Sequence, residues 1–151
     1  MGIVNKRTEI FEEIEEMFGQ VPSWLRSQPD AALPAFWALF RDFYLAETKI
    51  PNKYTELIGI AVSGATRCRY CQLFHTEAAR LRGATEDEIA EASMMAGVTM
   101  LGSTYLNAIG EHYERFAEET REIVAYVKAR QAGVVHPPET ARRKGDDTRA
   151  L

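Results

Sequence analysis

Apolar side chains recur at helical spacing through most of this chain, and glycines and prolines separate the segments in which they do so. No stretch has the apolar and polar alternation that is typical of a strand. The fold class we expect is therefore all-α, a multi-helix bundle. The pattern predicts helical segments over residues 3–18, 35–46, 52–65, 68–82, 86–101 and 104–130, with a short piece over 23–31 that is broken by Pro29.

Residues of known capping preference mark several of these boundaries. Pro34 stands where the first turn of the 35–46 helix is expected, a position that tolerates proline. Gly83 is well placed to end the 68–82 helix, because glycine adopts the left-handed backbone of a C-terminal cap at little cost. Thr85 and Glu88 have the spacing of a capping box, which predicts a new helix from residue 86.

Two segments are apolar around most of their circumference. The 35–46 helix is either central to the fold or shared with another subunit. The 52–65 helix has an apolar middle on nearly every side, so its carboxylate Glu56 is expected to be buried. The 3–18 helix is different, because it carries a group of glutamates that we interpret as its solvated face rather than as a metal site. These are Glu9, Glu12, Glu13, Glu15 and Glu16.

Length and composition indicate one globular domain with a core of ordinary size. We expect it to cover residues 1–131 of the 151, followed by a flexible tail over 132–151 that is poor in apolar residues. The net charge of −4 gives no reason to expect a nucleic-acid partner. No apolar run reaches the roughly 18 residues that span a bilayer, and the N-terminus is charged rather than signal-like. We expect a cytoplasmic protein without a membrane partner.

The chain has only two cysteines, and they stand in one turn of a predicted helix. Cys68 and Cys71 are three residues apart, and His75 follows four residues later. On a helix these offsets place all three side chains on one face. In a reducing compartment a Cys-x-x-Cys pair is typical of redox or metal chemistry rather than of a structural disulfide.

Three features favour the thiolate, which is the reactive form of cysteine. Cys68 falls in the first turn, where free backbone N–H groups and the helix dipole stabilise negative charge. Arg67 and Arg69 add positive charge, and His75 can take the proton of Cys71. A buried Glu56 would orient that imidazole and stabilise its charged form. The dipole favours Cys68 as the nucleophile and the imidazole favours Cys71; we give the imidazole more weight.

Other interpretations of the same residues remain open. The cysteines could be two small buried hydrophobic residues, or they could bind a metal together with His75 and Glu56. The metal interpretation ranks low, because structural zinc sites take a second ligand pair from a separate segment. Tyr70 could donate its hydroxyl to a peroxide or to His75, although packing is its more usual role. His112 and His136 we interpret as surface residues.

The spacing of Glu56, Cys68, Cys71 and His75 resembles the Glu…Cys-x-x-Cys-x-x-x-His signature of the alkylhydroperoxidase D-like (carboxymuconolactone decarboxylase) family. The resemblance covers residues 34–127, including an Ile-Pro-Asn-Lys lead-in and the Gly-Ala-Thr-Glu-Asp-Glu-Ile segment that follows the thiol helix. It implies an AhpD-like all-helical fold assembled into trimers or hexamers. The best-studied branch has a histidine directly before the second cysteine, where this chain has Tyr70.

The resemblance also implies roles for the four residues. Cys71 would be the peroxidatic cysteine, Cys68 the resolving cysteine, and Glu56 and His75 a proton relay. From this we expect a thiol-dependent alkyl hydroperoxide reductase, a peroxiredoxin-type antioxidant enzyme that needs no cofactor beyond its redox-active disulfide. Its partners would be a peroxide substrate and an external dithiol reductant. The alternatives are a redox-sensing protein whose dithiol switches assembly, a metal-binding module, and a decarboxylase of a lactone.

Overall fold

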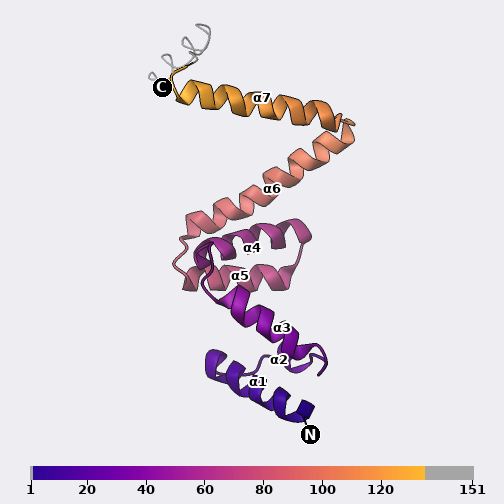
Figure 1. Cartoon of the computed structure of the whole chain (residues 1–151), viewed down its shortest axis with the longest axis vertical. Helices are drawn as coiled ribbons and strands as arrows, with labels where there is room; N and C mark the ends of the chain where they lie inside the picture. Colours follow the sequence, from indigo (N-terminus) through magenta and orange to yellow (C-terminus); the bar gives the residue numbers. More distant parts are fainter. Residues whose placement is uncertain (1, 135–151) are drawn as a thin grey trace. The chain divides into compact units, whose positions relative to one another are not determined.

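The computed structural model describes residues 2–134, with side chains from residue 6 onward (Figure 1). Within this range every regular element is a helix, so the predicted all-α class is confirmed. The elements are α1 Gly2–Phe18, α2 Ser23–Arg26, α3 Leu33–Leu39, the π-helix η1 Phe40–Leu45, α4 Asn52–Thr66, α5 Arg69–Leu81, α6 Glu86–Ala108 and α7 Tyr113–Gln131.

The chain divides into two compact units, residues 1–100 and residues 101–151, which we describe separately. The expected single domain over 1–131 stays a prediction. Most of the expected flexible tail, from residue 135 onward, lies outside the described residues.

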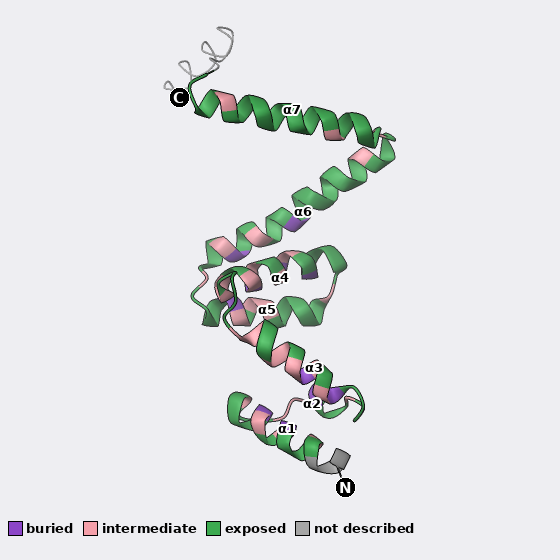
Figure 2. Ribbon diagram, viewed as in Figure 1, coloured by how far each residue is buried: buried purple, intermediate pink, exposed green. Residues whose placement is uncertain are grey.

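The first unit has a core that joins α1, α2 and α3. Its buried members are Ile10, Ile14, Leu25, Leu33 and Trp37. They come from three helices that are short or have only one apolar face, so the core forms only where these helices meet. Figure 2 shows buried positions on both α1 and α3.

One glutamate of α1 belongs to this core's polar edge rather than to the solvated face that the sequence predicts. The carboxylate of Glu13 accepts a hydrogen bond from the Trp37 indole at 2.8 Å and is paired with Arg41 at 3.0 Å. These two partners hold the pKa of Glu13 below its usual value. Glu13 is therefore only partly solvated, because the buried indole N–H of Trp37 needs an acceptor and Glu13 provides it.

A second core joins α4, α5 and α6 through Ile60, Ala79 and Ile89. The helices α4 and α5 lie side by side and are joined by a short turn at Arg67, which has a left-handed backbone with φ of 57° (Figure 1). The turn is held by a hydrogen bond of 3.0 Å from the Cys68 N–H to the Ser63 carbonyl. It places the start of α5 beside the end of α4.

The observed helix boundaries match the predicted ones where a capping residue marks them, and they differ from the prediction where no such residue exists. Pro34 lies in the first turn of α3, Gly83 has φ of 80° after α5, and Thr85 and Glu88 form both hydrogen bonds of a capping box, at 2.8 and 3.1 Å. The predicted break between 101 and 104 is wrong, because α6 continues to Ala108. The chain turns later, at Gly110, which has φ of 66°.

The second unit, within its described residues 101–134, contains the end of α6 and the whole of α7. No residue of α7 is buried (Figure 2). Large apolar side chains are exposed along it, among them Tyr113, Phe116, Ile123, Val124 and Val127. Within residues 2–134, no helix combines the length and the apolar character needed to cross a bilayer.

Candidate active site

The two cysteines lie at the beginning of α5. Cys68 is the residue that caps the helix, with an extended backbone, rather than a member of the helix as the sequence predicts. Its sulfur accepts a hydrogen bond of 3.2 Å from the Cys71 N–H, one of the N–H groups left free at a helix start. The two sulfurs are joined in a disulfide, with the Cα atoms 5.4 Å apart. Cys68 is half-buried, whereas Cys71 is exposed.

His75 lies one turn after Cys71 and is held by a carboxylate from the neighbouring helix. Its Nδ1 is 2.8 Å from Oε2 of Glu56, which is only 3% exposed. Glu56 stands in the first half of α4 and His75 in the middle of α5, so the pair links the two helices. The structure thus brings together the carboxylate and the imidazole that the sequence singled out.

Gly59 makes the space for the imidazole. It follows Glu56 by three residues on α4, and a Cβ atom at this position would lie under 3.0 Å from three atoms of the His75 ring. Real side chains do not approach so closely, so any larger residue would displace the ring or separate the helices. Glu56 and Gly59 together therefore define one position for His75.

Tyr44 is a member of the site that sequence reasoning missed. It lies in the π-helix η1, and its hydroxyl donates a hydrogen bond of 2.7 Å to Oε2 of Glu56. The same hydroxyl is 3.2 Å from Nδ1 of His75. In the sequence Tyr44 is one of many aromatic positions of the 35–46 segment, and nothing local distinguishes it from a packing residue.

The hydrogen bonds define the protonation of the imidazole. Oε2 of Glu56 accepts from both Tyr44 and His75, so the proton of a neutral His75 is placed on Nδ1. Nε2 then carries the free lone pair and is the atom that can accept a proton from a thiol. Burial, followed by the hydrogen bond to Glu56, raises the pKa of Tyr44 above its ordinary value of 10.0, so its hydroxyl remains a donor.

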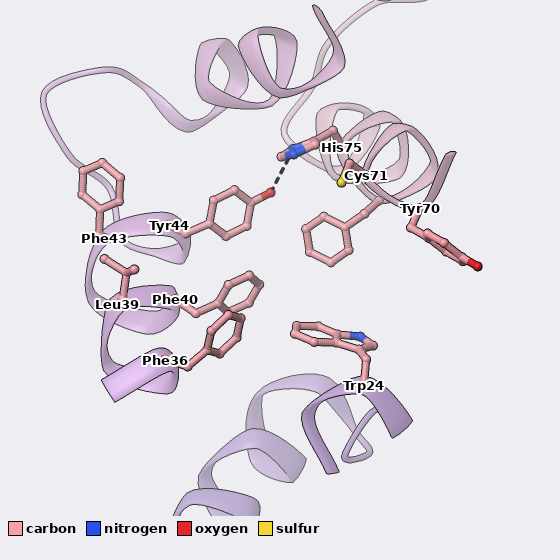
Figure 3. A pocket seen from close by; sticks show the side chains of 10 residues that line it. Trp24, Phe36, Leu39, Phe40, Phe43, Tyr44, Tyr70, Cys71 and His75 are labelled. Atoms are coloured by element: carbon pink, nitrogen blue, oxygen red, sulfur yellow. Dashed lines mark hydrogen bonds between the residues drawn. The ribbon is translucent and has the colours of Figure 1, made fainter. Parts of the chain in front are cut away.

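A cavity of about 500 Å³ opens beside Cys71 and His75 (Figure 3). The rest of its wall is aromatic or aliphatic, and no side chain with a permanent charge lines it. The lining residues are Trp24, Phe36, Leu39, Phe40, Phe43, Tyr44, Tyr70, Cys71, Phe74 and His75. Phe36 stacks on Phe40, and Phe40 on Tyr44, with ring centroids 6.0 and 4.8 Å apart, so one wall is a continuous aromatic surface.

Tyr70 lies at the rim of this cavity and is 74% exposed. Its hydroxyl points away from His75 (Figure 3) and accepts a long hydrogen bond of 3.4 Å from Arg69, whose guanidinium also lies over the ring. Tyr44, rather than Tyr70, lies against the imidazole, with its hydroxyl 3.2 Å from Nδ1 of His75.

The remaining candidates lie elsewhere. His112 is exposed and pairs with Glu114 at 3.0 Å, as its surface interpretation predicts. His136 lies outside the described residues. Among the described residues, no three His, Cys, Asp or Glu side chains are arranged to hold a metal ion, so the geometry gives the metal interpretation no support.

Gly59→Ala should misplace His75. We expect the variant to lose the contact between Glu56 and His75 and to slow alkylation of reduced Cys71 at neutral pH by about 100-fold, the usual scale of a general base. The matched control is Gly64→Ala on the same helix, where the new Cβ meets only Ala96 at 3.4 Å. The control should alkylate normally and gain up to about 1 kcal/mol of stability from helix propensity. Equal alkylation rates in both variants would show that the space at Gly59 is not required.

Comparisons with known proteins identify the family and the fold. The chain resembles an alkylhydroperoxidase AhpD core from Rhodospirillum rubrum, with a TM-score of 0.64 and 26% identity over 75% of this chain and 87% of that one. It is 34% identical over 74 residues to a Paracoccus denitrificans protein named uncharacterized protein 4 in cox locus. That match covers 49% of this chain and 66% of the relative, slightly less than two thirds of its length. The sequence model of the carboxymuconolactone decarboxylase family matches residues 31–111, more than half of the chain. The chain belongs to the carboxymuconolactone decarboxylase family and has an AhpD-like fold.

Proposed function

We propose that the protein is a thiol-dependent hydroperoxide reductase in which Cys71 reacts with the peroxide and Cys68 resolves the product. The observation that carries the proposal is the Cys68–Cys71 disulfide at the wall of a cavity that His75 also lines. Family and fold support thiol redox chemistry in general. The choice of a peroxide as the oxidant rests on the relay behind the disulfide and on the exposure of Cys71.

The first half of the proposed reaction starts from the reduced dithiol. Nε2 of His75 takes the proton of the Cys71 thiol, and Glu56 stabilises the imidazolium that results. The thiolate attacks one oxygen of the hydroperoxide, so that an S–O bond forms and the O–O bond breaks. The leaving alkoxide takes the proton from His75, and the products are an alcohol and a sulfenic acid on Cys71.

The second half returns the site to the oxidised state seen here. The Cys68 thiol attacks the Cys71 sulfur; the S–S bond forms, the S–O bond breaks, and hydroxide leaves with the thiol proton as water. An external dithiol then reduces the disulfide by exchange through a mixed disulfide, supplying two electrons and two protons. Such a donor is found in reducing compartments, and we propose a cytoplasmic location for this reason.

The cavity favours an organic hydroperoxide over hydrogen peroxide. Hydrogen peroxide has no apolar part that could contact the aromatic wall, whereas an alkyl or aryl hydroperoxide would bury its organic group there. Burial of one group of phenyl size is worth about 1.5–3 kcal/mol. The cavity therefore supplies binding energy to alkyl and aryl hydroperoxides but not to hydrogen peroxide.

Cys71→Ser should abolish peroxide consumption, and Cys68→Ser should permit a single turnover. Without Cys71 no thiolate faces the cavity, whereas without Cys68 the sulfenic acid forms and cannot be resolved. Stopped-flow mixing of reduced protein with peroxide measures the first effect, and trapping with dimedone detects the sulfenic acid. Normal peroxide consumption by Cys71→Ser would overturn the mechanism.

The same experiment separates this proposal from a redox switch. A reductase consumes peroxide continuously when a lipoyl, thioredoxin-like or glutathione donor is present. A sensor would form its disulfide once and then stop with every donor. Sustained turnover with at least one donor is the result that we expect.

Wild-type protein should prefer cumene hydroperoxide to hydrogen peroxide by about 10–100-fold in kcat/KM, because the cumyl group is buried against the aromatic wall. Leu39→Ser should lower the rate with cumene hydroperoxide several-fold and leave that with hydrogen peroxide unchanged. Leu39 is 63% exposed, so the fold should tolerate the change. The control is Leu81→Ser, at an exposed leucine outside this cavity. Equal rates for the two peroxides would argue against a substrate role for the cavity.

We also propose that the protein is a homo-oligomer. The apolar residues exposed along α6 and α7 form more uncovered apolar surface than a monomer usually presents. Light scattering at micromolar concentration should give a multiple of the monomer mass. Ile123→Glu should lower that mass, because it places a charge among these residues, and Glu119→Gln on the same helix should not. A monomer mass for the wild type would refute the proposal.

A further inference from the structure

Tyr44, Glu56 and His75 form a closed set of three polar atoms. Oη of Tyr44 is 2.7 Å from Oε2 of Glu56 and 3.2 Å from Nδ1 of His75, and the remaining side, from Oε2 to Nδ1, is 2.8 Å. Two of these atoms can donate, and Oε2 accepts from both. The three side chains come from η1, α4 and α5, so the set joins three elements of the first unit.

The hydroxyl of Tyr44 matters because Glu56 is so thoroughly buried. At 3% exposure the carboxylate has little access to water, and Tyr44 and His75 are the hydrogen-bond donors seen on it among the described residues. A buried carboxylate that loses one of its two donors is held in place by the other alone, so its oxygen is no longer fixed in line with Nδ1 of His75. An imidazole whose Nδ1–H has lost its aligned acceptor can carry its proton on Nε2 instead.

That change of tautomer would disable the base. With its proton on Nε2, His75 has no free lone pair toward the cavity and cannot accept the proton of Cys71. A displaced Glu56 carboxylate would also stabilise an imidazolium less well. Both effects reduce the thiolate form of Cys71 near neutral pH.

The other charged groups nearby do not replace Tyr44. Arg82, at the end of α5, is close enough for its charge to act on the Tyr44 hydroxyl. Glu77 and Arg82 both line a second cavity, of about 760 Å³, that Tyr44 and Glu56 also border. Neither makes a hydrogen bond to Glu56 among the described contacts, so neither provides the second donor.

The position of Tyr44 depends on an unusual piece of backbone. Residues Phe40–Leu45 form a π-helix, and the N–H of Ala46 bonds to the carbonyl of Arg41, five residues earlier, at 3.1 Å. Such turns insert one residue into the helical register and are frequent at functional sites. Here the turn carries the tyrosine whose hydroxyl reaches the carboxylate.

We propose that Tyr44 is a positioning residue: its hydroxyl keeps the Glu56 carboxylate aligned on Nδ1 of His75, and thereby keeps Nε2 free to take the proton of Cys71. This inference rests on the proposed function, because a free Nε2 matters only if Cys71 has to lose its proton. It can be tested without peroxide, because its readouts are the tautomer of His75 and the reactivity of the Cys71 thiol.

The test compares Tyr44→Phe with Tyr70→Phe in the reduced full-length protein. Both variants remove one hydroxyl from a tyrosine that lines the same cavity, and only the first removes a hydrogen bond to Glu56. Alkylation of Cys71 by iodoacetamide is followed against pH, and each measurement is repeated in Cys68→Ser so that one thiol is observed. Nitrogen-15 NMR of the imidazole side chains reports the tautomer, with three histidines in the chain to assign.

We expect Tyr44→Phe to move the alkylation profile to higher pH by about one unit, a tenfold loss of rate below the midpoint. Its His75 signals should gain Nε2–H character. Tyr70→Phe should match the wild type in both measurements. A wild-type profile and tautomer in Tyr44→Phe would overturn the proposal, and so would equal shifts in the two variants.

A second substitution covers the case in which Tyr44→Phe does not fold. A fluorotyrosine placed at position 44 by amber suppression keeps the ring and the hydroxyl and makes the hydroxyl a stronger donor. The profile should then move to lower pH, and an unchanged profile would contradict the role proposed for Tyr44. If the wild type reduced no peroxide while both shifts were found, the proposed function would fail and the role of Tyr44 would stand.

Discussion

The burial of one carboxylate constrains the arrangement around the dithiol. An ionised side chain that is 3% exposed is costly unless hydrogen bonds replace the water it has lost, and Glu56 obtains them from two other elements of the fold. His75 reaches Glu56 only because Gly59 leaves room for its ring against α4. Tyr44 reaches it only because η1 turns toward the same point. The hydrogen bonds of the buried Glu56 therefore constrain both the spacing of α4 and α5 and the position of η1.

The local features of the fold could be predicted because their causes lie within a few residues. The capping box at Thr85, the left-handed Gly83 and the proline in the first turn of α3 are each set by neighbouring backbone groups. The spacing from Cys68 to His75 belongs to this class, since one helix and the residue that caps it carry it. Where no capping residue marks a boundary, the prediction failed: α6 continues past residue 101, because a single glycine such as Gly102 costs a helix only about 1 kcal/mol and does not end it.

The long-range contacts could not be predicted in this way. The partners Trp37 and Arg41 of Glu13 lie 24 and 28 residues along the chain, and Tyr44 is 31 residues from His75. In the sequence Glu13 is one of several similar glutamates and Tyr44 one of several similar aromatics. Only the packing of α1 on α3, and of η1 against α5, decides which member of each group makes the contact.

Packing in the fold also explains why the aromatic 35–46 segment is apolar on nearly every side. It is apolar around its circumference because it serves two different surfaces. Trp37 is buried in the core with α1, while Phe36, Phe40 and Tyr44 turn a stacked edge toward the cavity. Leu39 and Phe43 also line the cavity and are exposed, at 63% and 67%. A helix that faces both a core and an apolar cavity has little circumference left for polar residues.

The two sulfurs differ in a way that bears on both halves of the proposed cycle. The Cys71 N–H bonds to the sulfur of Cys68, which is half-buried, whereas Cys71 is exposed beside the cavity. A sulfur that accepts a hydrogen bond at a helix start is the better leaving group in disulfide exchange, because that site stabilises the departing thiolate. In the proposed cycle, access and leaving-group stability would therefore both direct an incoming reductant to Cys71. On this mechanism the peroxide and the reductant react in turn at one sulfur, and Cys68 serves as its internal partner in both steps.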